Sequence, residues 1–277
     1  MATFNHDQFQ CCFQNWIAQQ HEDLDELVNA LSADSKITDE KLNHLCQKGI
    51  KHFEEYYEKR SLMAKHHAPS FLSPTWCSSF ENAYLWIGGC RPSISVRLVY
   101  SVCGSELNDQ LTEFLRGERK GNLAEISSEQ LKMINALHCK TIKAEETMST
   151  RMASLQAHSQ FFFFFFSFLI KQQRYIEEIA DEPLAMLAKM AGRVGESSQD
   201  LDRAMDAHSV SLASIMGDAD RLRLSTLKDL VGILTPLQTV DLFVATKKLH
   251  LSMHEWGKRS DNQIGKRFSS AHDIYLT

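Results

Sequence analysis

The amino-acid sequence predicts an all-α protein: a single bundle of about eight helices in which the long helices are antiparallel and no sheet forms. Two observations support this prediction. Apolar residues recur at intervals of three and four over most of the chain. The one strongly β-branched segment, residues 94–102, has no second segment with which a strand could pair. We expect the helical domain to cover residues 9–256, between an N-terminal tail, 1–8, and a flexible C-terminal tail, 257–277.

Two long apolar stripes predict the first two helices. The first stripe covers residues 7–31 and includes Phe13 and Trp16. A polar break follows, after which Thr38 is placed to cap a second helix that continues to residue 64. The charged face of this second helix includes Arg60. We expect that face to lie at the surface and to form weak ion pairs between residues four apart.

The later helices are predicted by capping residues as well as by apolar spacing. Ser127 begins a segment with capping chemistry. Thr235 is placed as the N-cap of the last helix and Pro236 as its first residue, while Gly257 is expected to end it. These helices are predicted to cover residues 94–102, 107–115, 127–156, 204–234 and 236–256.

The stretch from residue 73 to residue 93, which we call the signature loop, is the least helix-like part of the sequence. Ser78 and Glu81 have the spacing of a capping box, so a helix is expected to begin near Ser79. Apolar residues at helical spacing extend that helix until Gly88-Gly89 ends it. The most distinctive residues of the loop are Pro74, Thr75, Trp76, Cys77, Trp86, Gly88, Gly89, Arg91 and Pro92.

These residues resemble the signature of the plant Delay of Germination domain, which also forms the C-terminal part of the TGA bZIP transcription factors. The resemblance extends from about Phe9 to Trp256. It implies a helical, non-enzymatic regulator of seed dormancy or of hormone signalling such as that of abscisic acid. Such a protein is expected to act by protein contacts in the nucleus and cytoplasm.

The resemblance also implies a partner for the first helix. Stand-alone members of the family associate with type 2C protein phosphatases through an aromatic N-terminal motif, which Phe13 and Trp16 match here. Cys11 and Asn15 stand where that motif has acidic residues. The alternative, in which Trp16 packs in the helical core, stays open.

One pair of residues has ligand chemistry. His250 and His254 are four residues apart on the last helix, so both imidazoles face one side, and neither is expected to be fully buried. The resemblance implies that they bind haem. Because two axial ligands approach the iron from opposite faces, we expect one histidine to ligate while the other forms a hydrogen bond or positions a propionate.

No catalytic motif is present in the sequence, which predicts neither an enzyme nor a metal site. The net charge of −5 argues against autonomous nucleic-acid binding, although a transcription regulator related to the TGA factors is one alternative. A calmodulin-binding module is another, through residues 221–228. The seven cysteines predict a reducing compartment. Cys77, Cys90 and Cys103 could line one pocket or simply fill small apolar positions.

An apolar run from Phe161 to Ile170 interrupts the family-like sequence. It is too short to span a membrane, which needs about 20 apolar residues, so no membrane association is expected. Phenylalanine codons are rich in pyrimidines, as is the 3′ end of an intron. We therefore interpret residues 157–176 as a retained-intron insertion, whose removal would join Gln156 to Glu177 in one helix.

Overall fold

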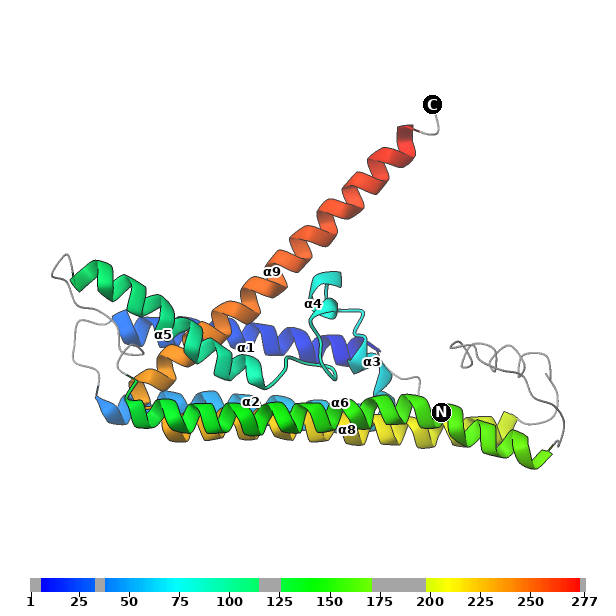
Figure 1. Cartoon of the computed structure of the whole chain (residues 1–277). Helices are drawn as coiled ribbons and strands as arrows, with labels where there is room; N and C mark the ends of the chain where they lie inside the picture. The colour runs from blue at the N-terminus through cyan, green and yellow to red at the C-terminus, as the bar shows by residue number, and fades with distance from the viewer. Residues whose placement is uncertain (1–5, 33–37, 115–125, 171–197, 275–277) are drawn as a thin grey trace.

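The computed structural model describes residues 6–32, 38–114, 126–170 and 198–274, most of which form helices (Figure 1). Within these residues there are eight helices and no sheet, which confirms the predicted fold class. The helices are α1 (His6–Ser32), α2 (Asp39–His67), α3 (Pro69–Leu72), α4 (Ser79–Ala83), α5 (Ser93–Phe114), α6 (Ser128–Ile170), α8 (Ser198–Ile233) and α9 (Pro236–Ile274).

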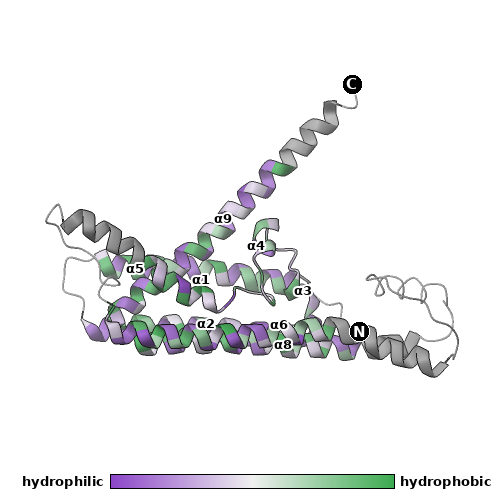
Figure 2. Cartoon of the chain, in the orientation of Figure 1, coloured by the Kyte–Doolittle hydropathy of each residue, from purple (hydrophilic) through white to green (hydrophobic). Residues whose placement is uncertain are grey.

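The long helices α2, α6 and α8 lie side by side, with α8 antiparallel to the other two (Figure 1). Helices α1 and α5 and the first part of α9 lie over this layer, and the second part of α9 projects away from it. Polar and apolar residues both occur along the coloured parts of each long helix, as Figure 2 shows. Each helix therefore buries one stripe and exposes the other.

Local capping chemistry fixes where several helices begin, as the sequence predicts. The Thr38 hydroxyl accepts a hydrogen bond from the backbone N–H of Lys41. Ser127 and Gln130 exchange side-chain and backbone hydrogen bonds at the start of α6. Thr235 and Gln238 do the same at the start of α9. Each such pair satisfies N–H groups that have no partner within the helix.

The buried apolar side chains of the described residues form three clusters. The first packs α1 and α2 against α8 and α9, the second joins α1 and α2 to the signature loop and α8, and the third lies among α5, α6, α8 and α9. Trp16, Phe53 and Phe243 belong to the first cluster. The second includes Phe71 and Trp86, so the signature loop is part of the core.

Several predicted helix boundaries are wrong. A single helix, α5, covers the residues that the sequence divides into two short helices at Gly104. The last helix does not end at Gly257 but continues to Ile274. A Cβ atom at position 257 would lie 2.0 Å from the Ser78 hydroxyl, so this glycine allows α4 to approach α9 closely rather than ending the helix.

Helix α6 continues through the phenylalanine-rich run to Ile170, whereas residues 171–176 lie outside the described residues. The interpretation of residues 157–176 as a retained-intron insertion stays a prediction. Within the described parts of the chain, no helix is both long and apolar enough to cross a membrane.

Candidate functional site

The signature loop departs from the predicted helix after one turn. Ser78 and Glu81 form the predicted capping box, but α4 ends at Ala83 and not at Gly88. Trp86 and Gly89 then pair as an isolated antiparallel bridge. The two residues between them, Ile87 and Gly88, have positive φ angles of 46° and 69°. This tight reversal is incompatible with a continuing helix.

Gly88 has a steric role in that reversal. A Cβ atom at this position would lie 2.7 Å from the backbone oxygen of Phe71, which is closer than van der Waals contact permits. Both the positive φ and this close approach require a residue without a side chain.

Two buried arginines hold the loop through its backbone carbonyl groups. Arg60 on α2 donates from Nη1 to the carbonyl oxygen of Gly88 at 2.5 Å. Arg223 on α8 donates from Nε to the carbonyl of Cys90 at 2.7 Å and from Nη2 to the carbonyls of Trp86 and Ile87. The two guanidinium groups thus bind four carbonyl groups of the loop, those of residues 86, 87, 88 and 90.

Asp220 neutralises both arginines. Its carboxylate accepts from Nε and Nη2 of Arg60 at 3.0 and 2.9 Å and from Nη1 of Arg223 at 2.5 Å. All three side chains are buried. Arg60 is therefore not a surface residue as its helix face predicted, because a buried guanidinium requires a carboxylate and further acceptors, and this site supplies them.

The remaining signature residues pack around the same loop. Trp76 lies against Phe71 and Phe9, with ring centroids 5.7 and 6.1 Å away. The Arg91 guanidinium lies 5.8 Å from the Trp86 ring centroid. Pro74 and Pro92 are buried, whereas Thr75 is exposed. Most of the signature is therefore explained by the packing of one irregular loop on four helices.

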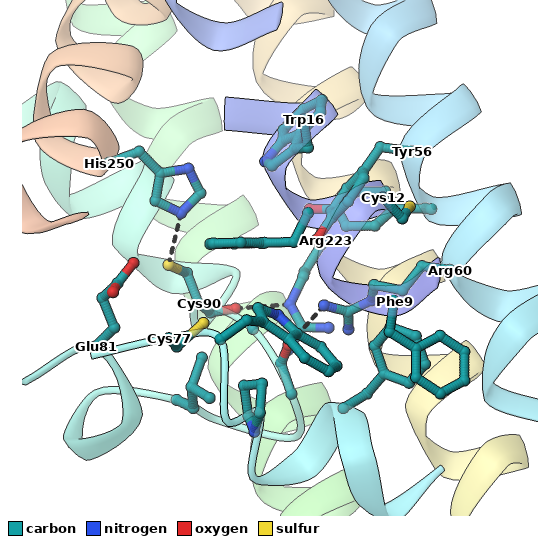
Figure 3. Close-up of a pocket in the computed structure, with 18 of the residues that line it drawn as sticks. Phe9, Cys12, Trp16, Tyr56, Arg60, Cys77, Glu81, Cys90, Arg223 and His250 are labelled. Atoms are coloured by element: carbon teal, nitrogen blue, oxygen red, sulfur yellow. Dashed lines mark hydrogen bonds between the residues drawn. The ribbon is translucent and has the colours of Figure 1, made fainter. Parts of the chain in front are cut away.

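A small cavity lies beside the loop, with a volume of about 110 Å³. Figure 3 shows its lining residues, which come from α1, α2, α8, α9 and the signature loop. They include Trp16, Arg60, Cys77, Cys90, Arg223 and His250. The cavity therefore brings together Cys77 and Cys90, two of the three cysteines for which the sequence left open either a shared pocket or small apolar positions.

His250 and His254 are both part of this region, but each has a partner. His250 Nε2 lies 3.2 Å from Cys90 Sγ, and His254 Nδ1 lies 2.7 Å from a carboxylate oxygen of Glu81. His254 is only 6% exposed, so the expectation that neither imidazole is fully buried is wrong for His254, whereas the His250 residue is partly exposed. The Nδ1 atom of His250 is buried and has no hydrogen-bond partner among the described residues.

The contact between Cys90 and His250 changes the acidity of both groups. Burial opposes ionisation of the Cys90 thiol, but His250 and the nearby guanidinium groups of Arg223 and Arg60 together outweigh it, so the pKa of Cys90 is lowered. The charge of Cys90 raises the pKa of His250 in spite of burial. The Cys90 thiolate and the His250 imidazolium therefore each stabilise the charged form of the other.

The residues present do not fit a haem in this conformation. Cofactor sites usually have volumes of about 300–1,000 Å³, and the cavity of about 110 Å³ is much smaller. Both histidines contact residues of the signature loop, and the cavity that His250 lines is too small for a porphyrin. The described residues contain no group of three or more His, Cys, Asp or Glu side chains that could hold a metal ion.

The predicted partner-binding residues of α1 point inward. Trp16 is 6% exposed and stacks on Tyr56 with ring centroids 4.2 Å apart. Phe13 is half-buried beside the cavity, and its ring lies edge-on to His254 at 5.5 Å. Trp16 therefore packs in the core, which is the alternative that the sequence left open.

A group of aromatic residues, which the sequence did not indicate, lies where α4 meets α9; two of its rings are exposed and that of Phe80 is half-buried. It consists of Phe80, Tyr84 and Trp256, and we call it the aromatic patch. The Phe80 ring lies 4.9 Å from that of Tyr84 and 4.3 Å from that of Trp256. Tyr84 is 58% and Trp256 50% exposed. Helical spacing predicts that Tyr84 lies within the helix that begins near Ser79, but α4 ends at Ala83 and Tyr84 is its C-cap.

The fold and this loop define an all-α regulatory domain with the Delay of Germination signature. The family described as Seed dormancy control (DOG1) matches residues 23–101. Protein DOG1-like 1 of Arabidopsis thaliana is 35% identical over 274 residues, covering 92% of this chain and 90% of that protein. The chain therefore belongs to this plant family of regulatory proteins.

Two further relatives support the same conclusion. Protein DOG1-like 3 of Arabidopsis thaliana is 32% identical and covers 91% of this chain and 84% of that protein. Transcription factor TGA2 of the same plant is 24% identical and covers 83% of this chain but 57% of that factor. The chain is thus related to a transcription factor family as well as to the stand-alone proteins.

Proposed function

We propose that this protein is a non-enzymatic regulator of seed dormancy or hormone signalling that acts by binding another regulatory protein. Its membership of the Seed dormancy control family supports the biological role. The aromatic patch supports the mode of action. The nucleus and cytoplasm are the compartments in which we expect it to act.

The exposed aromatic side chains of the patch are the observation that supports this proposal. Tyr and Trp are the residue types most enriched among side chains that dominate binding energies. Tyr84 and Trp256 each expose at least half of their surface while contacting the same ring, Phe80. An apolar pocket on a partner would cover two large aromatic groups whose positions are already fixed, so that little conformational entropy is lost on binding.

A type 2C protein phosphatase is the first partner to test, because the family resemblance implies one. The buried position of Trp16 gives that partner no access to the residue that the N-terminal motif suggests. We therefore assign the contact to the aromatic patch instead of to Phe13 and Trp16.

The other candidate functions have less support from the geometry. The segment considered for calmodulin binding, residues 221–228, contains the buried Arg223, Thr226 and Leu227. Calmodulin could reach its apolar face only if α8 left the bundle. Calcium-dependent retention of the folded protein on immobilised calmodulin would support that alternative against ours. A gel shift that weakens as salt is raised would likewise support DNA binding.

The experiment compares binding of purified type 2C phosphatases to the wild-type protein and to a Tyr84→Ala, Trp256→Ala double variant. We expect the double variant to bind at least about thirtyfold more weakly, which corresponds to about 2 kcal/mol. A matched control is Leu62→Ala, which removes a 54% exposed apolar side chain on α2. Equal affinity of wild type and double variant would contradict the assignment of the patch.

A further inference from the structure

Cys90 and His250 form a thiol–imidazole pair that the proposed function does not use. Cys90 lies just after the Trp86–Gly89 reversal, and His250 lies on α9, 160 residues further along the chain. Their Sγ and Nε2 atoms are 3.2 Å apart, as the dashed line in Figure 3 indicates. A nucleophile and a base within hydrogen-bonding distance is the arrangement that activates a cysteine.

The surrounding residues hold this pair in place. Arg223 donates from Nε to the carbonyl oxygen of Cys90, which fixes the backbone that carries the thiol. The second ring nitrogen of His250, Nδ1, is buried without a hydrogen-bond partner among the described residues. Among the described residues, Cys90 is therefore the hydrogen-bond partner of the His250 imidazole, through the Nε2 atom.

The cavity gives a small molecule access to the sulfur atom. Cys90 is partly exposed and lines the cavity together with His250. The cavity volume of about 110 Å³ is enough for a molecule of a few heavy atoms, since an engineered apolar cavity of about 150 Å³ binds benzene. A hydroperoxide as small as hydrogen peroxide fits this limit.

We propose that Cys90 is a site of oxidation by small hydroperoxides, with His250 as the base that holds its proton. This inference goes beyond the proposed function and does not depend on it, because it concerns the cavity and not the aromatic patch. The product is a cysteine sulfenic acid, the first and reversible step of thiol oxidation.

The atoms and electrons of the reaction balance. The Cys90 proton moves to Nε2 of His250, and the thiolate attacks one peroxide oxygen. The S–O bond forms as the O–O bond breaks, and the leaving hydroxide takes the proton back from the His250 imidazolium to become water. The sulfur is oxidised by two electrons and the peroxide is reduced by two, so no further reactant is needed.

The reaction would act on the contact between the signature loop and α9. The contact between Cys90 Sγ and His250 Nε2, which are 3.2 Å apart, joins these two segments in the reduced protein, and a sulfenic acid adds an oxygen atom to that sulfur. We therefore expect oxidation to weaken the packing of α9 against the loop at residues 90 and 250.

Other cysteines of the chain provide internal controls. Cys77 lines the same cavity, but burial, together with the charge of Glu81, raises its pKa to about 12. Cys46 is buried, and its thiol lies 3.5 Å from the carbonyl oxygen of Pro236; burial raises its pKa to about 11. Cys139 is exposed to solvent. Access alone favours Cys139, whereas activation by an imidazole favours Cys90.

The test treats the full-length, reduced protein with equimolar hydrogen peroxide and traps sulfenic acids with dimedone. Peptide mass spectrometry then gives the initial labelling rate of each cysteine. We expect Cys90 to be labelled at least about tenfold faster than Cys77 and Cys139. The rate for Cys90 includes any Cys77–Cys90 disulfide, because Cys90 sulfenic acid and a thiol condense to it with loss of water and dimedone then no longer reacts with Cys90.

Two variants separate the chemistry from folding. His250→Gln should lower the labelling rate of Cys90 at least about tenfold while leaving that of Cys139 unchanged. His254→Gln, one turn further along α9, should leave both rates unchanged. Circular dichroism establishes that each variant is folded. The ratio of the labelling rates of Cys90 and Cys139 in the wild-type protein tests the proposal even if neither variant folds. Labelling of Cys90 no faster than that of Cys77 or Cys139, or an equal rate in folded His250→Gln, would overturn the proposal.

Discussion

Aromatic and charged side chains have different roles in two regions of this molecule. Where α1 packs on α2 and α9, Trp16 and a charged group around Lys247 are buried. Where α4 meets the later part of α9, Tyr84 and Trp256 are exposed. Aromatic side chains thus stabilise the fold in the first region and are exposed to solvent in the second. Exposure, and not residue type, separates the two roles.

The first region contains a buried ion pair. Lys247 is 1% exposed and donates from Nζ to Asp23 at 2.8 Å and to Gln20 at 3.0 Å. His52 Nδ1 lies 2.9 Å from the same Asp23 carboxylate. Lys247 and His52 thus share the Asp23 carboxylate, so its loss would affect both of them.

The largest expected effect is that of Trp16→Ala. The substitution leaves a cavity between α1 and α2 where the indole stacks on Tyr56, so we expect a loss of about 3 to 5 kcal/mol of unfolding free energy. Denaturant unfolding followed by circular dichroism measures it. Trp16→Phe is the matched control and should cost less. A loss below about 1 kcal/mol for Trp16→Ala would place the indole outside the core.

Asp23→Asn should have the next largest effect, about 3 kcal/mol, because it leaves Lys247 buried without a carboxylate. Glu26→Gln is the matched control, since it removes the partner of Lys48 in a half-exposed pair and should cost less than about 1 kcal/mol. Urea unfolding of both variants at neutral pH makes the comparison. Equal losses would show that burial does not distinguish the two pairs.

The same pair predicts how stability depends on pH. Burial opposes ionisation of Asp23, but Lys247 and His52 together outweigh it, so the pKa of Asp23 lies below its ordinary value of 3.8. The unfolded chain therefore binds more protons than the folded one in that acid range, and the stabilisation is lost as the pH falls through it. Wild type should lose stability there more steeply than Asp23→Asn, as thermal melts at several pH values would reveal. Parallel profiles would contradict this origin.

Local features of the fold could be predicted from the sequence, whereas long-range ones could not. The caps at Thr38, Ser78, Ser127 and Thr235 depend on residues three apart, so their spacing is visible in the chain. The contact between Arg60 and Asp220 joins residues 160 apart. The spacing of residues along one helix does not reveal such a pairing, so the sequence predicts a surface position for Arg60.

The candidate site divides in the same way. The signature residues stood out in the sequence, but the reversal at Ile87-Gly88 depends on carbonyl groups that Arg60 and Arg223 bind from two other helices. The sequence does not reveal those distant donors, so the helical spacing of apolar residues predicts a helix that continues to Gly88-Gly89. The aromatic patch was missed for the same reason, because its exposure follows from the early end of α4.

The smallest expected effect on stability is that of Trp256→Ala. Its indole is half exposed, so the unfolding free energy should fall by less than about 1 kcal/mol, in contrast to Trp16→Ala. The same denaturant series measures both variants. A loss as large as that of Trp16→Ala would mean that the patch supports folding instead of binding.

Binding of a type 2C phosphatase by wild type, by the Tyr84→Ala, Trp256→Ala variant and by Trp16→Phe tests the central claim most directly. Titration calorimetry gives the affinities, and the melting temperature of each variant shows that it is folded. The account predicts that the double variant binds at least about thirtyfold more weakly and that Trp16→Phe binds as wild type does. Full affinity in the double variant, or no phosphatase binding by the wild-type protein, would contradict it.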